Sequence, residues 1–524
     1  MKKHIALSII TTLSLTTLNA YEFKPVGFKA VGMGGTGVAS TRGSLSSYYN
    51  PALLRFSDHT SEFSLNMGIR MRESNLMDPL DKLNELDFDG TLDRIAKKTP
   101  VGNKDINADG DTDDIGEAGT NNTDEDRHTI SQAQDILRQI GTNNAFNMSV
   151  TPSFTAQMSD AFAIGIFASA DINLRLNIDP HYTDLIFKDE NTGKYYQYSP
   201  IDESNPSDDK YTLYADDAQG KKAYETSSLD YAQNNGINYI QVNTMVLGEV
   251  PISYAKAFDW KSGTWSFGGN IKPMTLITTS QKVNLGSSSD DADDDKDQYE
   301  TTYDPTIGLD LGVAYRPTNS KMTIGLVGKN INSPTFKVDT TATGASDYTI
   351  DPMFRAGISM PILNDNIEFA LDIDLTKNKT LIEGEDSQMA GVGIELHPAS
   401  WFALRLGAMQ DMASKKFDDG TIMTAGVGFG LKWLQVDLSA MMSTNTGQYD
   451  GNDIPRYAAV NFSIISKWGD GYNHKKPPVE DEVQQESQDT QLAEQEKARI
   501  QKESDLAQEE LNASQEEFDK IFQE

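Results

Sequence analysis

The sequence contains no cysteine among its 524 residues, which excludes disulfide bonds, thiolate metal sites and a cysteine nucleophile. Basic residues are also scarce, because 45 Lys and Arg stand against 78 Asp and Glu, giving a formal net charge of -33. Proteins that bind nucleic acid need a basic surface to contact the phosphates. Nucleic acid is therefore not expected as a partner, and most of the negative charge is expected in solvated loops.

Long apolar runs are absent after the first twenty residues. Met1–Ala20 carries Lys2 and Lys3, then an apolar core at Ile5–Leu18 and a small-residue end. This pattern predicts a secretory signal peptide at 1–20, with the mature chain beginning at Tyr21. No later run reaches the roughly 18 apolar residues of a transmembrane helix. A secreted chain of this kind is either soluble or a transmembrane β-barrel.

Glycine and serine concentrate between Val31 and Leu54, and this stretch ends in Asn50-Pro51-Ala52. Glycine permits tight turns and close packing, while Pro51 fixes its own φ and pushes Asn50 towards extended geometry. The composition predicts a compact plug rather than a strand or a long helix.

The same stretch contains Gly32-Met33-Gly34-Gly35-Thr36-Gly37, which matches the dinucleotide-binding fingerprint. That fingerprint requires a preceding buried strand and a surrounding βαβ unit. A signal peptide precedes it here and no such unit follows, so these glycines predict a close-packing loop.

Apolar and polar residues alternate from Ala161 onwards. Every second residue from Phe162 to Ile178 is apolar, whereas Asp171 and Arg175 occupy the alternate positions. Period two over this length predicts a strand with one wholly apolar face. The same signature recurs along the chain, and Gly268-Gly269 and Pro273 predict a local defect within one strand. The fourteen expected strands are 61–72, 146–157, 161–178, 238–257, 263–283, 303–315, 320–330, 351–360, 366–377, 388–397, 400–411, 420–431, 434–445 and 456–468.

The connections between these strands alternate between long and short. Bacterial outer-membrane barrels have an even strand count, short periplasmic turns and long outer loops. An all-β, antiparallel transmembrane barrel of about 14 strands is therefore the expected fold, located in the outer membrane of a Gram-negative cell. The strands of a soluble secreted sandwich also alternate between apolar and polar residues, but that fold does not explain why long and short connections alternate.

Tryptophan gives an independent indication of membrane interfaces. Interfacial girdles collect amphipathic rings at the two edges of a barrel. Tyr239, Tyr303, Tyr348, Tyr449 and Tyr457 lie near the long connections and predict an outer girdle. All five tryptophans lie beside the short turns or at the end of the last strand and predict a periplasmic girdle: Trp260, Trp265, Trp401, Trp433 and Trp468.

Two further segments differ in composition from the barrel. The insertion 73–145 contains helix-like patterns at 79–86 and 129–140, the second of which is amphipathic and expected to pack against a barrel rim or loop. Residues 469–524 form a linker and then a Glu- and Gln-rich tail whose apolar residues do not recur as a sustained heptad. The tail is expected to be a polar helix or disordered in the periplasm, with an envelope partner or peptidoglycan as an alternative role.

One acidic loop resembles the first half of a calcium-binding loop. Its oxygen-bearing residues alternate and Gly110 occupies the sixth position, but the twelfth is Gly116 rather than Glu. An EF-hand is therefore not expected; a Ca²⁺ site in an outer loop and a solvated acidic loop both remain open. The candidate ligands are Asp105, Asn107, Asp109, Asp111 and Asp113.

Catalytic motifs are missing from the sequence. It has six histidines but neither G-x-S-x-G nor H-E-x-x-H, and no nucleophile or acid pair is marked on a strand or loop end. We expect no enzymatic activity and no resident cofactor other than the Ca²⁺ considered above.

The glycine-rich segment followed by Tyr48-Tyr49-Asn50-Pro51-Ala52, together with the strand count, resembles the FadL-type outer-membrane transporters. The form Asn-Pro-Ala-Leu-Leu and the long insertion after the first strand look more like the conjugal transfer protein TraF branch of these barrels. The resemblance covers about residues 21–468. It implies a signal peptide at 1–20, an N-terminal hatch at 21–60, a barrel at 61–468 and a tail at 469–524. The implied hatch residues are Gly32, Gly34, Gly35, Gly37, Tyr49, Asn50, Pro51 and Ala52.

By this resemblance, a hydrophobic small molecule would enter passively from outside, and movement of the hatch or a strand kink would release it. The alternative is a structural or interaction barrel of the cell envelope, such as a conjugation apparatus, with the tail binding a periplasmic partner. Outer-membrane lipid and lipopolysaccharide are the expected surroundings in either case.

Overall fold

The computed structural model describes residues 22–86, 124–140, 144–188, 193–198, 211–284, 304–337, 347–380, 385–471 and 495–515, apart from 215, 364, 416, 418, 432 and 450. The chain divides into two compact units, Met1–Gly469 and Asp470–Glu524. Within the described residues, no helix is long and apolar enough to cross a bilayer. The expected signal peptide lies outside the described residues.

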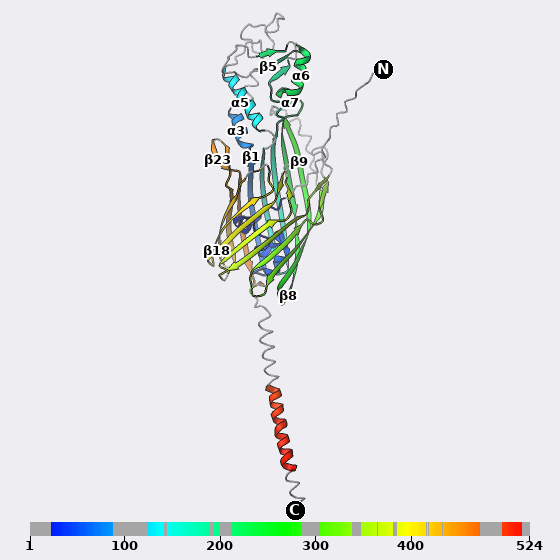
Figure 1. Cartoon of the computed structure of the whole chain (residues 1–524), viewed down its shortest axis with the longest axis vertical. Coiled ribbons are helices and arrows are strands. Elements are labelled where there is room, and N and C mark those ends of the chain that lie inside the picture. Colours follow the sequence, from blue (N-terminus) through cyan, green and yellow to red (C-terminus); the bar gives the residue numbers. More distant parts are fainter. Residues whose placement is uncertain are drawn as a thin grey trace, which may run out of the picture. The chain divides into compact units, whose positions relative to one another are not determined.

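The first unit is a closed antiparallel barrel (Figure 1). Consecutive strands pair with one another, and β24 pairs with β1 to complete the ring. The ring contains fifteen strand segments, of which β7 and β8 lie end to end as one barrel strand, so the expected fourteen strands are confirmed. The segments are β1 (Ser61–Ser74), β2 (Ala145–Gln157), β3 (Phe162–Asn177), β7 (Tyr239–Glu249), β8 (Ile252–Trp260), β9 (Gly263–Asn284), β10 (Asp304–Pro317), β11 (Thr323–Lys329), β14 (Met353–Ile362), β15 (Ile367–Asp374), β18 (Met389–Ala399), β19 (Phe402–Asp411), β20 (Ile422–Gly430), β21 (Leu434–Ser443) and β24 (Tyr457–Trp468).

The prediction of one continuous strand at 238–257 is wrong at its centre. The structure interrupts it at Val250-Pro251, between β7 and β8, because proline has no N–H to donate to a ladder. The defect predicted at Gly268-Gly269 and Pro273 lies elsewhere, since β9 is unbroken. The Pro273 carbonyl accepts a hydrogen bond from Val250 N–H at 2.9 Å, so β9 stays bonded to the neighbouring strand beside the interruption.

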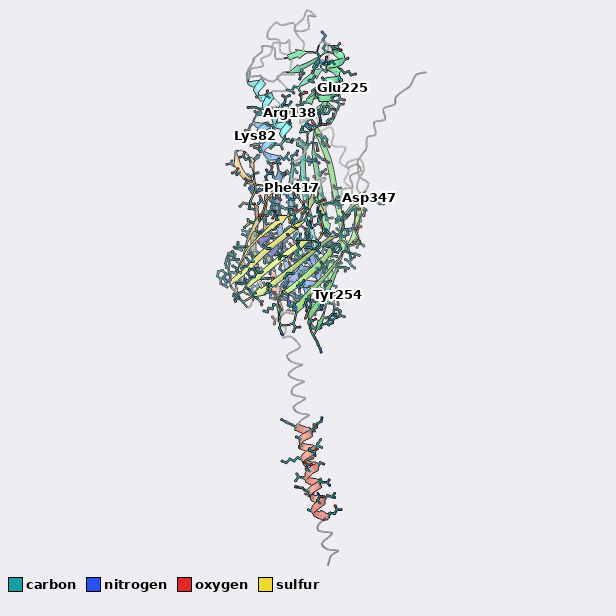
Figure 2. The ribbon with its side chains drawn as sticks, viewed as in Figure 1. Lys82, Arg138, Glu225, Tyr254, Asp347 and Phe417 are labelled. Atoms are coloured by element: carbon teal, nitrogen blue, oxygen red, sulfur yellow. The ribbon has the colours of Figure 1, made fainter. Side chains whose placement is uncertain are left out.

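The two faces of each strand follow the predicted alternation. Leu65 in β1 and Leu438 in β21 are exposed by 53% and 51%, whereas the polar residues Asn66 and Asp437 beside them are 1% exposed. Apolar side chains therefore cover the outside of the barrel, as Tyr254 does (Figure 2), and polar side chains fill the inside. This arrangement is the reverse of that in a soluble protein and is typical of barrels surrounded by lipid.

The long connections carry additional elements at one end of the barrel (Figure 1). The two expected helices of the insertion are present as α3 (Met77–Glu85) and α5 (Asp124–Ile140). Leu137 and Ile140 of α5 pack with Leu176 and Ile178 at the end of β3, as its amphipathic pattern predicts. The other elements are β4 (Ile186–Lys188), β5 (Tyr195–Tyr198), β6 (Tyr211–Leu213), α6 (Asp217–Ser227), α7 (Leu229–Asn234), β12 (Thr335–Lys337), β13 (Asp347–Thr349), β16 (Asn378–Lys379), β17 (Asp386–Ser387), β22 (Thr446–Tyr449) and β23 (Asn452–Pro455).

The segment before β1 folds into short helical turns inside the barrel. They are α1 (Phe28–Gly32), η1 (Gly43–Leu45), α2 (Ser46–Tyr49) and η2 (Pro51–Phe56). None is longer than six residues, in keeping with the plug predicted from the composition. We call residues 22–60 the hatch segment.

The second unit is described at 470–471 and at 495–515, and the second of these segments is helical, with every residue exposed.

Candidate functional site

The hatch segment is the candidate site, because it lies inside the barrel and is bonded to several strands of the wall. All eight residues that the resemblance implies are buried in the structure. They contact the barrel wall on several strands, and Tyr49 also holds the start of the hatch segment. Apart from Gly268, which lies against Pro51 and Ala52, the wall residues that make these contacts were not singled out from the sequence.

Two tyrosines hold the first residues of the hatch segment in place. The Tyr49 hydroxyl accepts a hydrogen bond from Val26 N–H at 2.7 Å and donates one to the Val26 carbonyl at 2.8 Å. The Tyr48 hydroxyl donates to the Lys24 carbonyl at 2.9 Å. Burial raises the pKa of Tyr49, so its hydroxyl keeps the proton that it donates. The Tyr-Tyr pair therefore ties α2 to the chain entering the lumen.

Asn50 and Pro51 form the first contact with the wall, against β10 and β11. Asn50 caps η2, since its Oδ1 accepts a hydrogen bond from Ala52 N–H at 3.1 Å and proline follows at the first helical position. Its Nδ2 donates to the Val313 carbonyl of β10 at 3.2 Å. A Cβ at Gly312 would lie 2.0 Å from Asn50 Oδ1, so only glycine allows this approach.

The glycine-rich turn forms the second contact, against β18, β19 and β20. Thr424 Oγ1 accepts a hydrogen bond from Gly34 N–H at 2.9 Å and donates one to the Gly32 carbonyl at 3.0 Å. A Cβ at Gly391 would lie 1.8 Å from the Gly34 carbonyl oxygen, and one at Gly407 would lie 2.5 Å from Gly34 N. The glycines of the apparent dinucleotide fingerprint thus pack against glycines of the wall.

Asp372 of β15 binds the turn between these two contacts. Its Oδ2 accepts hydrogen bonds from Gly37 N–H at 2.7 Å and Val38 N–H at 2.9 Å. Its Oδ1 has no hydrogen-bond partner among the described residues, and Asp372 and Arg355 line a cavity of about 10 Å³. A cavity of this size holds a single water molecule.

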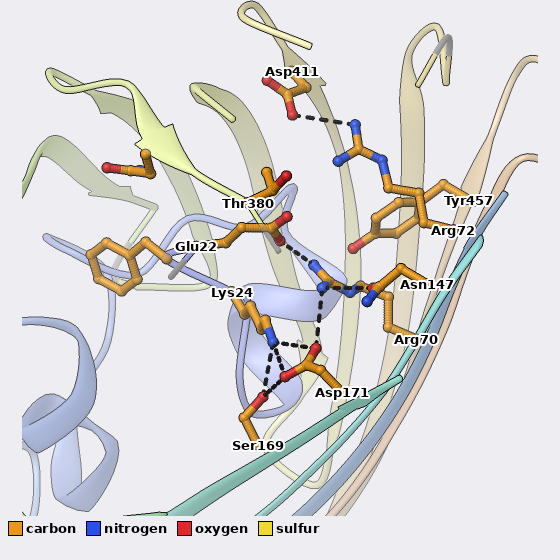
Figure 3. Close-up of polar contacts among 12 residues, drawn as sticks. Glu22, Lys24, Arg70, Arg72, Asn147, Ser169, Asp171, Thr380, Asp411 and Tyr457 are labelled. Carbon is orange, nitrogen blue, oxygen red and sulfur yellow. Dashed lines mark hydrogen bonds and ion pairs between the residues drawn. The ribbon is translucent and has the colours of Figure 1, made fainter. Parts of the chain in front are cut away.

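Ion pairs anchor the start of the hatch segment to β1 and β3 (Figure 3). Lys24 Nζ lies 2.6 Å from Asp171 Oδ1, and Glu22 Oε2 lies 2.7 Å from Arg70 of β1. Burial by itself raises the pKa of Glu22, but the charges of Arg70 and Arg72 outweigh it and lower the pKa to about 2. Burial lowers the pKa of Lys24, and the Asp171 carboxylate offsets this only in part.

A second ion-pair cluster anchors α1. Lys29 Nζ lies 2.6 Å from Glu368 and 2.8 Å from Glu395, and Arg405 also contacts Glu395 at 2.7 Å. Burial lowers the pKa of Lys29, but the two carboxylates outweigh it and raise the pKa above its ordinary value. Lys29 therefore keeps its charge inside the lumen.

The lumen holds two clusters of buried apolar side chains between the hatch segment and the wall, and the larger one surrounds Phe23 and Tyr48. Hatch residues Phe23 and Tyr48 pack there with methionine, leucine and aromatic side chains of the wall and of the β12–β13 hairpin. Lys329 of β11 points into the same region, with its Nζ 3.6 Å from the Tyr48 ring centre and 4.6 Å from that of Phe23. The Lys329 ammonium makes no hydrogen bond or ion pair within the described part of the chain. We call the wall side of this region the apolar patch: Phe167, Met245, Leu247, Met274, Leu276, Val327 and Met353.

Most of the other predicted residues lie on the outside of the barrel or beyond the described residues, whereas Tyr348 and Tyr457 are buried. Trp260, Trp401, Trp433 and Trp468 are exposed on the barrel near the short turns, and Trp265 packs on Tyr315 with ring centres 4.5 Å apart. Tyr348 and Tyr457, which were expected in an outer girdle, are only 1% exposed, so that prediction is wrong for them. Tyr303 lies outside the described residues.

The candidate calcium ligands, Asp105 to Asp113, also lie outside the described residues, and the Ca²⁺ site remains a prediction. The described residues contain no group of three His, Asp or Glu side chains arranged to hold a metal ion.

Sequence reasoning missed Asp372, Lys24, Lys29 and Lys329. Asp372 could have been recognised, because it occupies a polar alternate position of a strand whose other face is apolar and exposed. Such positions face the lumen, but their partners come from distant parts of the chain and leave no local pattern.

Comparison with known proteins gives a family and several similar structures. The family model described as F plasmid transfer operon, TraF, protein matches residues 47–375. The CymD monoaromatic hydrocarbon channel is 12% identical, with 86% of this chain and 99% of that chain covered and a TM-score of 0.44. The Pseudomonas putida toluene transporter TodX is 10% identical, with 86% and 99% covered and a TM-score of 0.38. A Pseudomonas aeruginosa FadL homologue is 10% identical, with 85% and 98% covered and a TM-score of 0.36.

No curated protein matches the chain. The family match covers more than half of the sequence, from Ser47 at the Tyr-Tyr-Asn-Pro-Ala motif to the end of β15. It agrees with the resemblance to the TraF branch that those residues carry. The chain belongs to the F plasmid transfer operon TraF protein family.

Proposed function

We propose that this chain is an outer-membrane channel of a Gram-negative cell, through which hydrophobic small molecules pass when the hatch segment moves. The observation that carries the proposal is the apolar patch beside Phe23 and Tyr48. Barrels that enclose only water have polar interiors. Met245, Met274 and Met353 add flexible side chains to this patch, and such side chains adapt to ligands of different shape.

The outer surface supports a location in a membrane. Apolar side chains of consecutive strands are exposed on the outside of the barrel, among them Leu65, Leu438 and Ile271. Exposure of so many large apolar residues around a whole barrel is favourable only when lipid covers them. Trp401 and Trp433, beside the short turns, fit a membrane interface.

The interruption at Val250-Pro251 supports a lateral exit from the patch. The β3 register is unchanged from Phe167 opposite Glu249 to Ile164 opposite Ile252, and the Pro251 carbonyl accepts a hydrogen bond from Gly165 N–H at 3.0 Å. Pro251 has no N–H to donate, so the ladder is one donor short beside the patch residue Phe167. The interrupted strand pairs with β9 on its other side. There β9 pairs with β7 as far as Met274 and with β8 from Ile271. A wall with fewer hydrogen bonds opens at lower cost, and we propose that ligands leave here once the hatch segment shifts.

A deletion strain complemented with variants tests this function. Met245→Asp places a charge in the apolar patch and is expected to abolish uptake of hydrophobic compounds such as toluene. Asn173→Asp is the matched control, because Asn173 lies on the neighbouring strand β3 and also faces the lumen, but on its polar wall. Normal uptake of every hydrophobic compound by the deletion strain would count against a channel.

A structural or interaction barrel is the second candidate. It is favoured by the many ion pairs that hold the hatch segment closed, such as Lys29 with Glu368 and Lys24 with Asp171. In this case the barrel would be a rigid support for an envelope assembly, and the tail would bind a periplasmic partner. Recovery of no envelope protein with residues 469–524 from cross-linked cells would argue against it.

A further inference from the structure

The described helix of the tail, 495–515, has no packing partner within the described part of its own unit. Each of its residues is exposed, and the apolar side chains of Ile500, Leu506 and Leu511 are exposed by 59%, 53% and 59%. Most helical stability in proteins comes from packing of one face against a partner, and no face of this helix is packed within its described unit. We therefore expect this helix to pack against a partner surface.

The polar residues of this helix keep a seven-residue period that the apolar residues do not. In a coiled coil, the positions flanking the packed seam are called e and g. If the periodic glutamates are assigned to g and the periodic glutamines to e, the a and d positions between them form one continuous seam along the helix. The glutamates are Glu496, Glu503 and Glu510, and the glutamines are Gln501, Gln508 and Gln515. The seam positions are then Lys497, Ser504 and Leu511 at a, and Ile500, Ala507 and Ser514 at d.

The flanking residues decide the orientation and the partner. In a parallel pair of identical helices, each g residue faces an e residue of the other helix, so Glu503 would meet Gln508 and accept a hydrogen bond from its amide. In an antiparallel pair, g faces g, and glutamates would repel one another. We propose that residues 495–515 form a parallel coiled coil with the same segment of a second copy of this chain.

The seam is small, which sets the expected strength of this association. Ser504, Ala507 and Ser514 bury little apolar surface, and Lys497 at an a position lowers stability while fixing the register. Association is therefore expected to depend on the high local concentration of chains held in one membrane. The inference goes beyond passage through the lumen and stands whether or not the barrel conducts.

The absence of cysteine makes disulfide cross-linking a clean test in the full-length chain. Ile500→Cys at d and Leu511→Cys at a are expected to form dimers under mild oxidation in native membranes. Leu506→Cys is the matched control, since Leu506 is similarly exposed but lies at the c position on the far side of the helix. Disulfides need Cα atoms within about 7 Å, so the seam positions should cross-link about tenfold faster than the control.

Each alternative gives a different pattern of cross-links. An antiparallel pair centred on Ala507 would hold the two thiols of the Ile500→Cys variant about 20 Å apart, so neither this variant nor Leu511→Cys would cross-link to itself. Equal rates at all three positions would indicate random collision, and no dimer at any position would mean that the tail does not self-associate. All of these results overturn the proposal. Heat-modifiable migration of the barrel on gels verifies that each variant is folded.

Discussion

Tyr49 and Val26 exchange two hydrogen bonds, because the tyrosine hydroxyl both accepts from the Val26 N–H and donates to its carbonyl. Tyr49→Phe removes both and leaves two buried backbone groups unpaired, at a cost of about 1–3 kcal/mol for each. We expect faster amide exchange at residues 24–30, measured by hydrogen–deuterium exchange. Tyr48→Phe removes one bond, to the Lys24 carbonyl, and should have a smaller effect. Equal effects of the two variants would contradict this assignment.

Asp372 is expected to be the main polar attachment of the turn at Gly37 and Val38. Asp372→Asn keeps an acceptor but removes the charge, and hydrogen bonds to charged acceptors are roughly twice as strong as neutral ones. Asp372→Ala removes the acceptor entirely. Amide exchange at both positions should therefore rise in the order wild type, Asn, Ala. Single-channel conductance in planar bilayers should rise in the same order, and unchanged exchange in the Ala variant would refute the role.

Replacement of a wall glycine should displace the hatch segment. A Cβ at Gly391 would collide with the Gly34 carbonyl oxygen at 1.8 Å, and both are backbone positions that cannot rotate away. Gly391→Ala is expected to increase proteolysis of the hatch segment in the folded barrel. Gly269→Ala is the control, because its Cβ would meet no atom closer than 3.4 Å. Similar proteolysis of the two variants would show that the fit at Gly391 is not limiting.

Replacing two lumen lysines by methionine should affect the Tm of the barrel differently. Lys272 pairs with Glu249 and Asp310, both at 2.9 Å, so Lys272→Met removes the cation that both buried carboxylates contact and should destabilise the barrel by about 3–5 kcal/mol. Lys329 has no such ion pair among the described residues, and Lys329→Met exchanges a buried charge for an apolar side chain. We expect an unchanged or higher Tm for Lys329→Met. A Tm drop as large as that of Lys272→Met would indicate an ion pair that we have not recognised.

The attachment of Glu22 to Arg70 should survive moderate acid. The pKa of Glu22 is lowered from 4.5 to about 2. The ion pair therefore stabilises the folded state fully above pH 4.5, and this stabilisation is lost as the pH falls towards 2. Pepsin, which is active over this range, should cleave near Phe23 much faster at pH 2 than at pH 4. Glu22→Gln lacks the charge and should be cleaved readily at both values. Resistance of the wild type at pH 2 would contradict the lowered pKa.

The sequence alone determined the architecture. Period-two alternation is a local property of each strand, so Phe162–Ile178 or 434–445 could be recognised without knowing any neighbour. The alternation of long and short connections then fixed an even ring of strands with both ends on one side. The composition of 31–54 predicted a compact plug, because glycine and Asn50-Pro51 restrict what that backbone can form.

Only the tertiary structure decided what the plug touches. Asp372 lies more than three hundred residues from Gly37 in sequence, and Gly391 is equally far from Gly34, so neither contact leaves a periodic signal. The break at Val250-Pro251 also needed the structure, since a proline inside an apolar run can occupy an edge, a bulge or a gap. Local periodicity sets which face of a strand is inside, whereas closure of the barrel sets which residues meet there.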